Sequence, residues 1–291
     1  MPIEFLPPLP PLAGWVSHMQ DVKRCRGTAC YGALVAHFGT DSPKLLEWRV
    51  DRRKPYRTRE DESVSNKYRR WRQGLALPGD GTVAHVAKRS NQSVRLEHWR
   101  DLPLWTLLDP EPPPMAWMLR LLERAPRPIE RILFGLRESS MRVAHTQLDR
   151  HQTLAIRDQH SLDAFIVLLC LARKGEALED DPRHYLPASC AFQILPNVLY
   201  RHRALRYRWE GLFECLDRIF WKRMYVTGAY YKFPIETVRS GLERLTMDTS
   251  AELLRIAAMR SGTTGYKFAE HVDDEAAHMT PVNRSPTLLR S

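Results

Sequence analysis

The sequence lacks any apolar run long enough to cross a membrane. Its longest candidate, Phe165 to Ala172, has eight residues, whereas a helix that spans a bilayer needs about 20. The first twelve residues contain five prolines and no basic segment, so they cannot form the apolar helix of a signal peptide. We therefore expect a cytoplasmic protein that has no membrane among its partners.

Cysteine is scarce. The five cysteines are an odd number in a chain without a secretion signal, which favours reduced thiols over a disulfide framework. Two of them lie between two histidines, in the order His18, Cys25, Cys30 and His37, and these four side chains are of the types that bind structural zinc. The Cys-x-x-Cys pairing typical of such sites is absent, so we favour unligated side chains and expect no cofactor.

The motifs of common catalytic sites are also missing. The chain has no phosphate-binding Gly-x-x-x-x-Gly-Lys loop, dinucleotide fingerprint or Gly-x-Ser-x-Gly elbow. The one dense acidic cluster, Glu179 to Asp181, precedes a proline and fits a helix end in solvent better than a metal site. His145, His151 and His160 stand among arginines, as in a nuclease that uses histidine as acid and base, although an exposed basic face explains them better.

Basic residues, by contrast, are abundant and unevenly placed. The net charge is +10. Arg49 to Arg72 holds ten basic and four acidic residues, and Arg201 to Arg223 holds seven and three, so the rest of the chain is neutral. Such clusters, interleaved with aromatic rings, are typical of surfaces that contact phosphates and stack on bases. In these two segments we expect nucleic acid to contact Arg52, Arg53, Lys54, Arg57, Arg201, Arg203, Arg206 and Arg208.

Prolines divide the chain into parts. The first is a proline-rich arm whose prolines favour polyproline II, and the run Pro110-Glu-Pro-Pro-Pro114 is a second break that no helix can cross. We place the domain boundary there. The predicted parts are an arm at 1–12, an N-terminal domain at 13–109, a linker at 110–114, a helical domain at 115–262 and a disordered polar tail at 263–291.

The fold class should be mainly α. After the linker, apolar residues recur at three- and four-residue steps, and Ser161 can cap the strongly apolar Leu162 to Arg173, the expected centre of the core. Residues 207–226 predict one buried helical stripe, and Pro234 should open a helix that ends before a Thr249–Glu252 capping box.

The N-terminal domain has a more mixed pattern. Tyr31 to Phe38 fits either a strand or a helix, whereas Pro43 to Arg49 predicts a short helix. Residues 51–63 have almost no apolar side chains and should form a solvated loop. Further helices are expected over Asn66 to Gln73 and from Asp80 to Arg89.

One segment resembles a known family. Residues 65–90, which include Ser65-Asn-Lys-Tyr-Arg-Arg-Trp-Arg-Gln-Gly74, Pro78 and Val83 to Ala87, resemble the second half of a helix-turn-helix domain of the phage-repressor type. In that family a recognition helix ends in Trp-x-x-Gly, and the next helix packs beneath it. The first helix would come from Lys44 to Val50. The resemblance implies that the major groove is faced by Asn66, Lys67, Arg69 and Arg70, with Arg72 near the DNA backbone.

These features together predict a non-enzymatic, nucleic-acid-binding protein, with DNA favoured over RNA. It would act in transcription regulation, or as the subunit of a larger assembly of proteins that positions nucleic acid. Two alternatives remain open. One is a helical scaffold whose basic surface binds an acidic protein, and the other is a nuclease that uses the central histidines and arginines.

Overall fold

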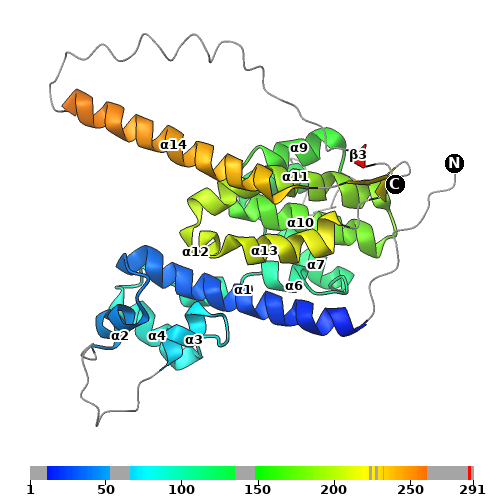
Figure 1. Ribbon diagram of the computed structural model, residues 1–291. Helices are drawn as coiled ribbons and strands as arrows, with labels where there is room; N and C mark the ends of the chain where they lie inside the picture. The colour runs from blue at the N-terminus through cyan, green and yellow to red at the C-terminus, as the bar shows by residue number, and fades with distance from the viewer. Residues whose placement is uncertain are drawn as a thin grey trace.

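The computed structural model describes residues 12–52, 66–134, 148–222, 225–226, 229–231, 233–260 and 288–289. It is built almost entirely of helices, so the predicted mainly α fold is confirmed (Figure 1). The proline-rich arm and most of the polar tail fall outside the described residues. In the described part, no helix is both long enough and apolar enough to span a bilayer.

The longest of the N-terminal helices is α1, which in Figure 1 runs between α2, α3 and α4 below it and the C-terminal helices above it. Tyr31 to Phe38, whose pattern fitted a strand or a helix, forms the last part of α1. Ser42 caps the next helix at Leu45 N. The elements are α1 (Leu12–Phe38), α2 (Pro43–Asp51), α3 (Lys67–Arg72), α4 (Asp80–Arg89), α5 (Leu96–Arg100) and α6 (Leu104–Leu107).

The C-terminal elements form a second group of helices with a short antiparallel sheet. The helices are α7 (Met115–Glu123), α8 (Arg127–Phe134), α9 (Arg150–Arg157), α10 (Leu162–Ala177), α11 (Asp181–Arg201), α12 (Arg203–Arg206), α13 (Trp209–Leu216), the π-helix η1 (Asp217–Trp221) and α14 (Ile235–Arg260). The strands are β1 (Tyr225–Val226), β2 (Ala229–Tyr231) and β3 (Leu288–Leu289), and β2 lies between the other two.

Helix α10 is the centre of the larger core, as predicted. The Ser161 hydroxyl accepts a hydrogen bond from Ala164 N at 3.1 Å and so caps the helix. Its side chains from Leu162 to Arg173 are buried except Asp163. The same buried cluster contains Leu107 from α6 and Met118 from α7, so apolar packing continues across residues 110–114. The division into domains at this linker stays a prediction.

A second, smaller core lies at the C-terminal end of α1. It joins residues of α1, α2, α3 and α4, and the rings of Tyr68 and Trp71 are buried in it. Gly74 follows the C-cap residue of α3; its φ is +69°, and a Cβ atom there would lie 2.4 Å from the Arg24 carbonyl oxygen. Only glycine has both the left-handed backbone and the space for this close crossing over α1.

Two stretches of helix differ from what local patterns suggest. The predicted break before Thr249 is wrong: α14 continues through it, and the Thr249 hydroxyl donates to the Leu245 carbonyl one turn earlier instead of capping a new helix. Helix α11 contains Pro187 and Pro196 in its interior, although each proline removes one helical hydrogen bond. Tertiary packing compensates for these losses.

Candidate nucleic-acid interface

The first predicted basic segment lies partly on described residues. Arg53, Lys54 and Arg57 fall outside them. Arg52 is exposed in a left-handed conformation at the end of α2. Asn66 begins α3 without capping it through its side chain, and Arg69 and Arg70 are exposed on α3 and form no ion pair with any described residue. These side chains are accessible to a ligand, and the helix-turn-helix resemblance itself stays a prediction.

Two other residues of α3 already have acidic partners. Lys67 Nζ lies 2.8 Å from Asp51 Oδ2, and Arg72 Nη2 lies 3.0 Å from Asp41 Oδ2. Each of these cations is compensated within the protein, so its attraction for a phosphate is weaker than the sequence pattern alone indicates. The free charge of α3 is therefore that of Arg69 and Arg70.

Asp41 links the two basic segments. The Tyr207 hydroxyl donates to Asp41 Oδ1 at 2.8 Å, while Arg72 donates to the other carboxylate oxygen. The Tyr31 hydroxyl donates to the backbone oxygen of Asp41 at 2.9 Å. Burial raises the pKa of Tyr207, so this hydroxyl keeps its proton as a donor. The segments that contain Arg72 and Tyr207 thus meet at the C-terminal end of α1.

A glycine in α1 permits this arrangement. A Cβ atom on Gly32 would lie 2.6 Å from the carbonyl oxygen of Ala204 and 2.7 Å from Tyr207 Cβ. Because Gly32 has no side chain, α12 packs directly against the backbone of α1. The short helix and the arginines on either side of it are held beside α1 for this reason.

A pocket of about 330 Å³ opens beside this crossing. We call it the arginine pocket. It contains three arginines from two separate parts of the chain, two histidines and one tryptophan, and no carboxylate stands among its lining residues. The residues that line it are Ala33, Ala36, His37, Ser93, Val94, Arg95, Trp99, Arg201, His202, Arg203 and Ala204. A pocket of this charge favours anions.

The three arginines differ in how far their charge is compensated. Arg203 is exposed, and its side chain forms no hydrogen bond or ion pair with any described residue. Arg201 donates from Nη1 to the carbonyl oxygen of His160 at 3.2 Å, a contact that leaves its charge uncompensated. Arg95 donates from Nε to Glu97 Oε1 at 3.1 Å, on a side chain that is 71% exposed. Arg201 and Arg203 are thus the strongest cations of the pocket.

The half-buried ring of Trp99 forms one wall of the arginine pocket. It meets the His202 ring edge to face, with 5.9 Å between the ring centroids. A wider cavity of about 620 Å³ shares Ser93, Arg95 and Trp99 with the arginine pocket. Unlike the arginine pocket, it also has carboxylates in its lining, those of Glu97, Asp101 and Asp163.

His202 is held neutral by its surroundings. Burial is the main cause that lowers its pKa below the ordinary value of 6.5, with His98 and Arg201 acting in the same direction and Asp163 against them. His18 also has a lowered pKa, again mainly through burial. Both imidazoles are therefore neutral donors and acceptors in the folded protein at pH 7.

We expect the free energy of unfolding to fall as the pH is lowered from 7.5 to 5.5. The unfolded chain binds a proton at His202 near pH 6.5, whereas the folded protein binds it only at a lower pH. The contribution of His202 to stability is therefore complete above pH 6.5 and is lost as the pH falls below it. Urea denaturation at three pH values measures this slope. His202→Gln should flatten it, and an equal slope in both proteins would contradict the assignment.

The four residues considered for zinc do not converge. His18 and His37 are separated by 19 positions on α1, which corresponds to about 28 Å along a helix. His18 Nε2 lies 2.7 Å from the Leu108 oxygen, and Cys25 lies beside Cys215, which with burial raises the pKa of the Cys25 thiol. Within the described residues, no three His, Cys, Asp or Glu side chains are arranged to hold a metal ion.

Two of the three histidines considered for nuclease chemistry lie within the described residues. His151 is exposed on α9, and His160 lies in the turn before α10 with a φ of +45°. His145 falls outside the described residues. Asp180 of the acidic cluster caps α11 by accepting a hydrogen bond from Arg183 N at 3.1 Å. The cluster thus connects two helices.

Sequence patterns alone predicted only two of the charged and aromatic residues that line the arginine pocket, Arg201 and Arg203. His37, Arg95, Trp99 and His202 were not among the predicted site residues, because they lie outside the basic segments or carry no charge of their own. Arg206 donates instead to Thr246 Oγ1, and Arg208 lies over the Tyr207 ring. No protein-family model, curated protein or solved structure matches the chain.

Proposed function

We propose that this protein binds nucleic acid without cleaving it, and that the arginine pocket is the contact site. The observation that carries the proposal is the convergence of Arg95, Arg201 and Arg203 on a pocket that has no carboxylate in its lining. Arginine suits phosphate because its planar fork can donate two parallel hydrogen bonds. Each phosphate neutralised in this way releases counterions and adds to affinity.

Trp99 favours a nucleic-acid strand over a simple anion. Proteins that bind single strands combine a positive groove with aromatic rings on which bases stack, and Trp99 lies among the arginines in this way. A volume of about 330 Å³ suits a nucleotide and its phosphate, whereas a duplex keeps its bases stacked inside. We propose DNA with accessible bases as the ligand, bound by a regulator or by a subunit that positions nucleic acid.

The test is the salt dependence of binding to a labelled single-stranded DNA. Fluorescence anisotropy over a salt series gives the slope of log affinity against log salt concentration. Because each phosphate contact on a single strand contributes about 0.7 to that slope, Arg201→Ala with Arg203→Ala should lower it by up to about 1.4. A duplex of equal length should bind more weakly, since its bases cannot reach Trp99.

Arg127→Ala with Arg131→Ala is the matched control. Both arginines are exposed on α8, and neither lines the arginine pocket. The control removes the same charge, so it separates a local contact from the general field of the protein. If the control lowers the slope as much as the pocket variant does, or if neither changes it, the arginine pocket is not the binding site.

A further inference from the structure

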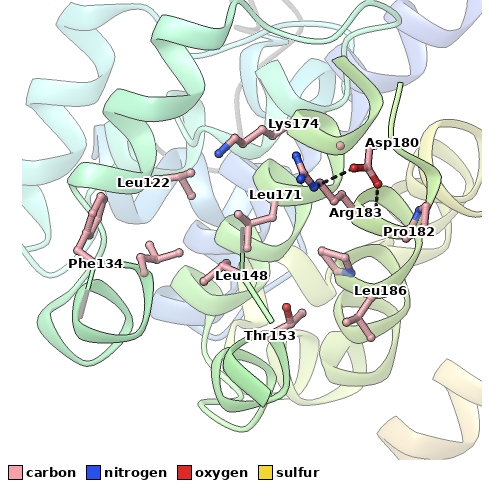
Figure 2. Close-up of a pocket in the computed structure, with 13 residues that line it drawn as sticks. Leu122, Phe134, Leu148, Thr153, Leu171, Lys174, Asp180, Pro182, Arg183 and Leu186 are labelled. Carbon is pink, nitrogen blue, oxygen red and sulfur yellow. Dashed lines mark hydrogen bonds and ion pairs between the residues drawn. The ribbon is translucent and has the colours of Figure 1, made fainter. Parts of the chain in front are cut away.

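A third cavity lies on another part of the molecule, among α7, α8, α9, α10 and α11. It has a volume of about 360 Å³ and shares no lining residue with the arginine pocket. Figure 2 shows its walls, with Lys174 and the Asp180–Arg183 pair in the upper part and Phe134, Leu148 and Leu186 lower down. The lining residues are Leu122, Leu133, Phe134, Leu148, Thr153, Leu171, Lys174, Gly175, Asp180, Pro182, Arg183, Leu186 and Pro187.

Most of this lining is apolar. Five leucines, together with one phenylalanine and two prolines, surround the space. The Thr153 hydroxyl is already committed, because it donates to the Asp149 carbonyl at 3.0 Å. A water molecule in such a cavity finds few hydrogen-bond partners, whereas an apolar ligand gives up no hydrogen bonds when it enters. The cavity is also within the size range of small-molecule sites.

Of the charged side chains that line the cavity, Lys174 alone has no counter-charge among the described residues. Asp180 Oδ2 lies 2.8 Å from Arg183 Nε, and Asp180 Oδ1 accepts from Arg183 N, so this pair is neutral overall and mutually bonded. The Lys174 side chain forms no hydrogen bond or ion pair with any described residue. An apolar space beside one uncompensated ammonium group is complementary to a ligand with an apolar body and a single negative charge.

From this geometry we propose that the cavity binds a small amphiphilic carboxylic acid. The apolar chain lies among Leu122, Leu171 and Leu186, and the carboxylate accepts a hydrogen bond from Lys174 Nζ. A dianionic phosphate suits the site less well, because Arg183 is held by Asp180 and leaves Lys174 as the one available cation among the described lining residues. This site is independent of the nucleic-acid proposal.

Titration calorimetry with hexanoate, octanoate and decanoate tests the apolar part of the proposal. Burying one methylene group is worth about 0.8 kcal/mol, so each added methylene should lower Kd about fourfold until the cavity is full. The heat should saturate at one ligand per chain. Failure of all three acids to give saturable one-to-one binding would overturn the proposal.

Lys174→Met tests the polar part, since methionine keeps the volume and removes the charge. It should weaken octanoate binding by at least about tenfold and leave binding of 1-octanol unchanged. Lys88→Met, an exposed lysine on α4, should change neither ligand. Leu186→Trp should exclude both ligands by filling the cavity. If Lys174→Met binds octanoate as tightly as the wild type does, a carboxylate site is wrong.

Discussion

The Trp71→Ala protein is expected to lose about 3–5 kcal/mol of unfolding free energy, the usual cost of truncating a large buried aromatic residue. Trp71 is 3% exposed, and its ring meets the buried Tyr68 ring edge to face at 5.3 Å. The two rings hold α3 on the smaller core beside α1. Urea denaturation followed by circular dichroism measures the loss.

Trp48→Ala is the matched control for this substitution. Trp48 lies on the neighbouring helix α2 and is 44% exposed, so its truncation should cost no more than about 1 kcal/mol. A second outcome concerns the role of the ring. If Trp71→Ala kept the stability of the wild type and lost nucleic-acid binding, the ring would be a stacking surface for bases and not an anchor of α3.

The Glu176→Ala protein should be destabilised by a similar amount, about 3–5 kcal/mol, because it leaves a buried guanidinium without its carboxylate. Arg173 is fully buried, and its Nη1 lies 2.5 Å from Glu176 Oε2. Arg173 Nη2 also donates to the Asp109 carbonyl at 2.5 Å. This ion pair thus connects α10 to the chain just before the proline run. The same denaturation experiment measures the effect.

The double variant Arg173→Met with Glu176→Leu distinguishes a lost partner from lost packing. Replacing both members of a buried ion pair by apolar residues of similar size is often close to neutral. The double variant should therefore be more stable than Glu176→Ala, despite carrying more changes. A double variant less stable than the single one would mean that the pair itself, with its bond to Asp109, contributes net stability.

Helices that carry their own local signals were predictable from the sequence. Ser161 and the apolar run after it gave the start of α10, which continues four residues beyond the predicted Arg173, and Asp80 to Arg89 matched α4, because caps and three- to four-residue spacing act within a few residues. Residues 181–201 had no such prediction, since Pro187 and Pro196 are helix breakers unless packing compensates for them.

The arginine pocket was only partly predictable. Arg201 and Arg203 stood out as members of a basic segment, but Arg95 and Trp99 stand more than 100 positions away from them. No local pattern reports that such residues will meet. The sequence also could not show that two residues of the first basic segment are compensated. In the folded protein Lys67 forms an ion pair with Asp51, and Arg72 forms one with Asp41.

Charge and helical periodicity are properties of neighbouring residues, so the helices and the two basic segments could be read directly along the chain. The position of a charge in space depends instead on which helices pack together. Gly32 allows α12 to approach α1, and Gly74 allows α3 to cross it. Arg72 and Tyr207, which lie close to these two crossings in the chain, both bond to Asp41, and the approach at Gly32 also brings Ala204 into the lining of the arginine pocket. Long-range backbone packing, which a single sequence does not display, thus determines which of the basic residues remain available to a ligand.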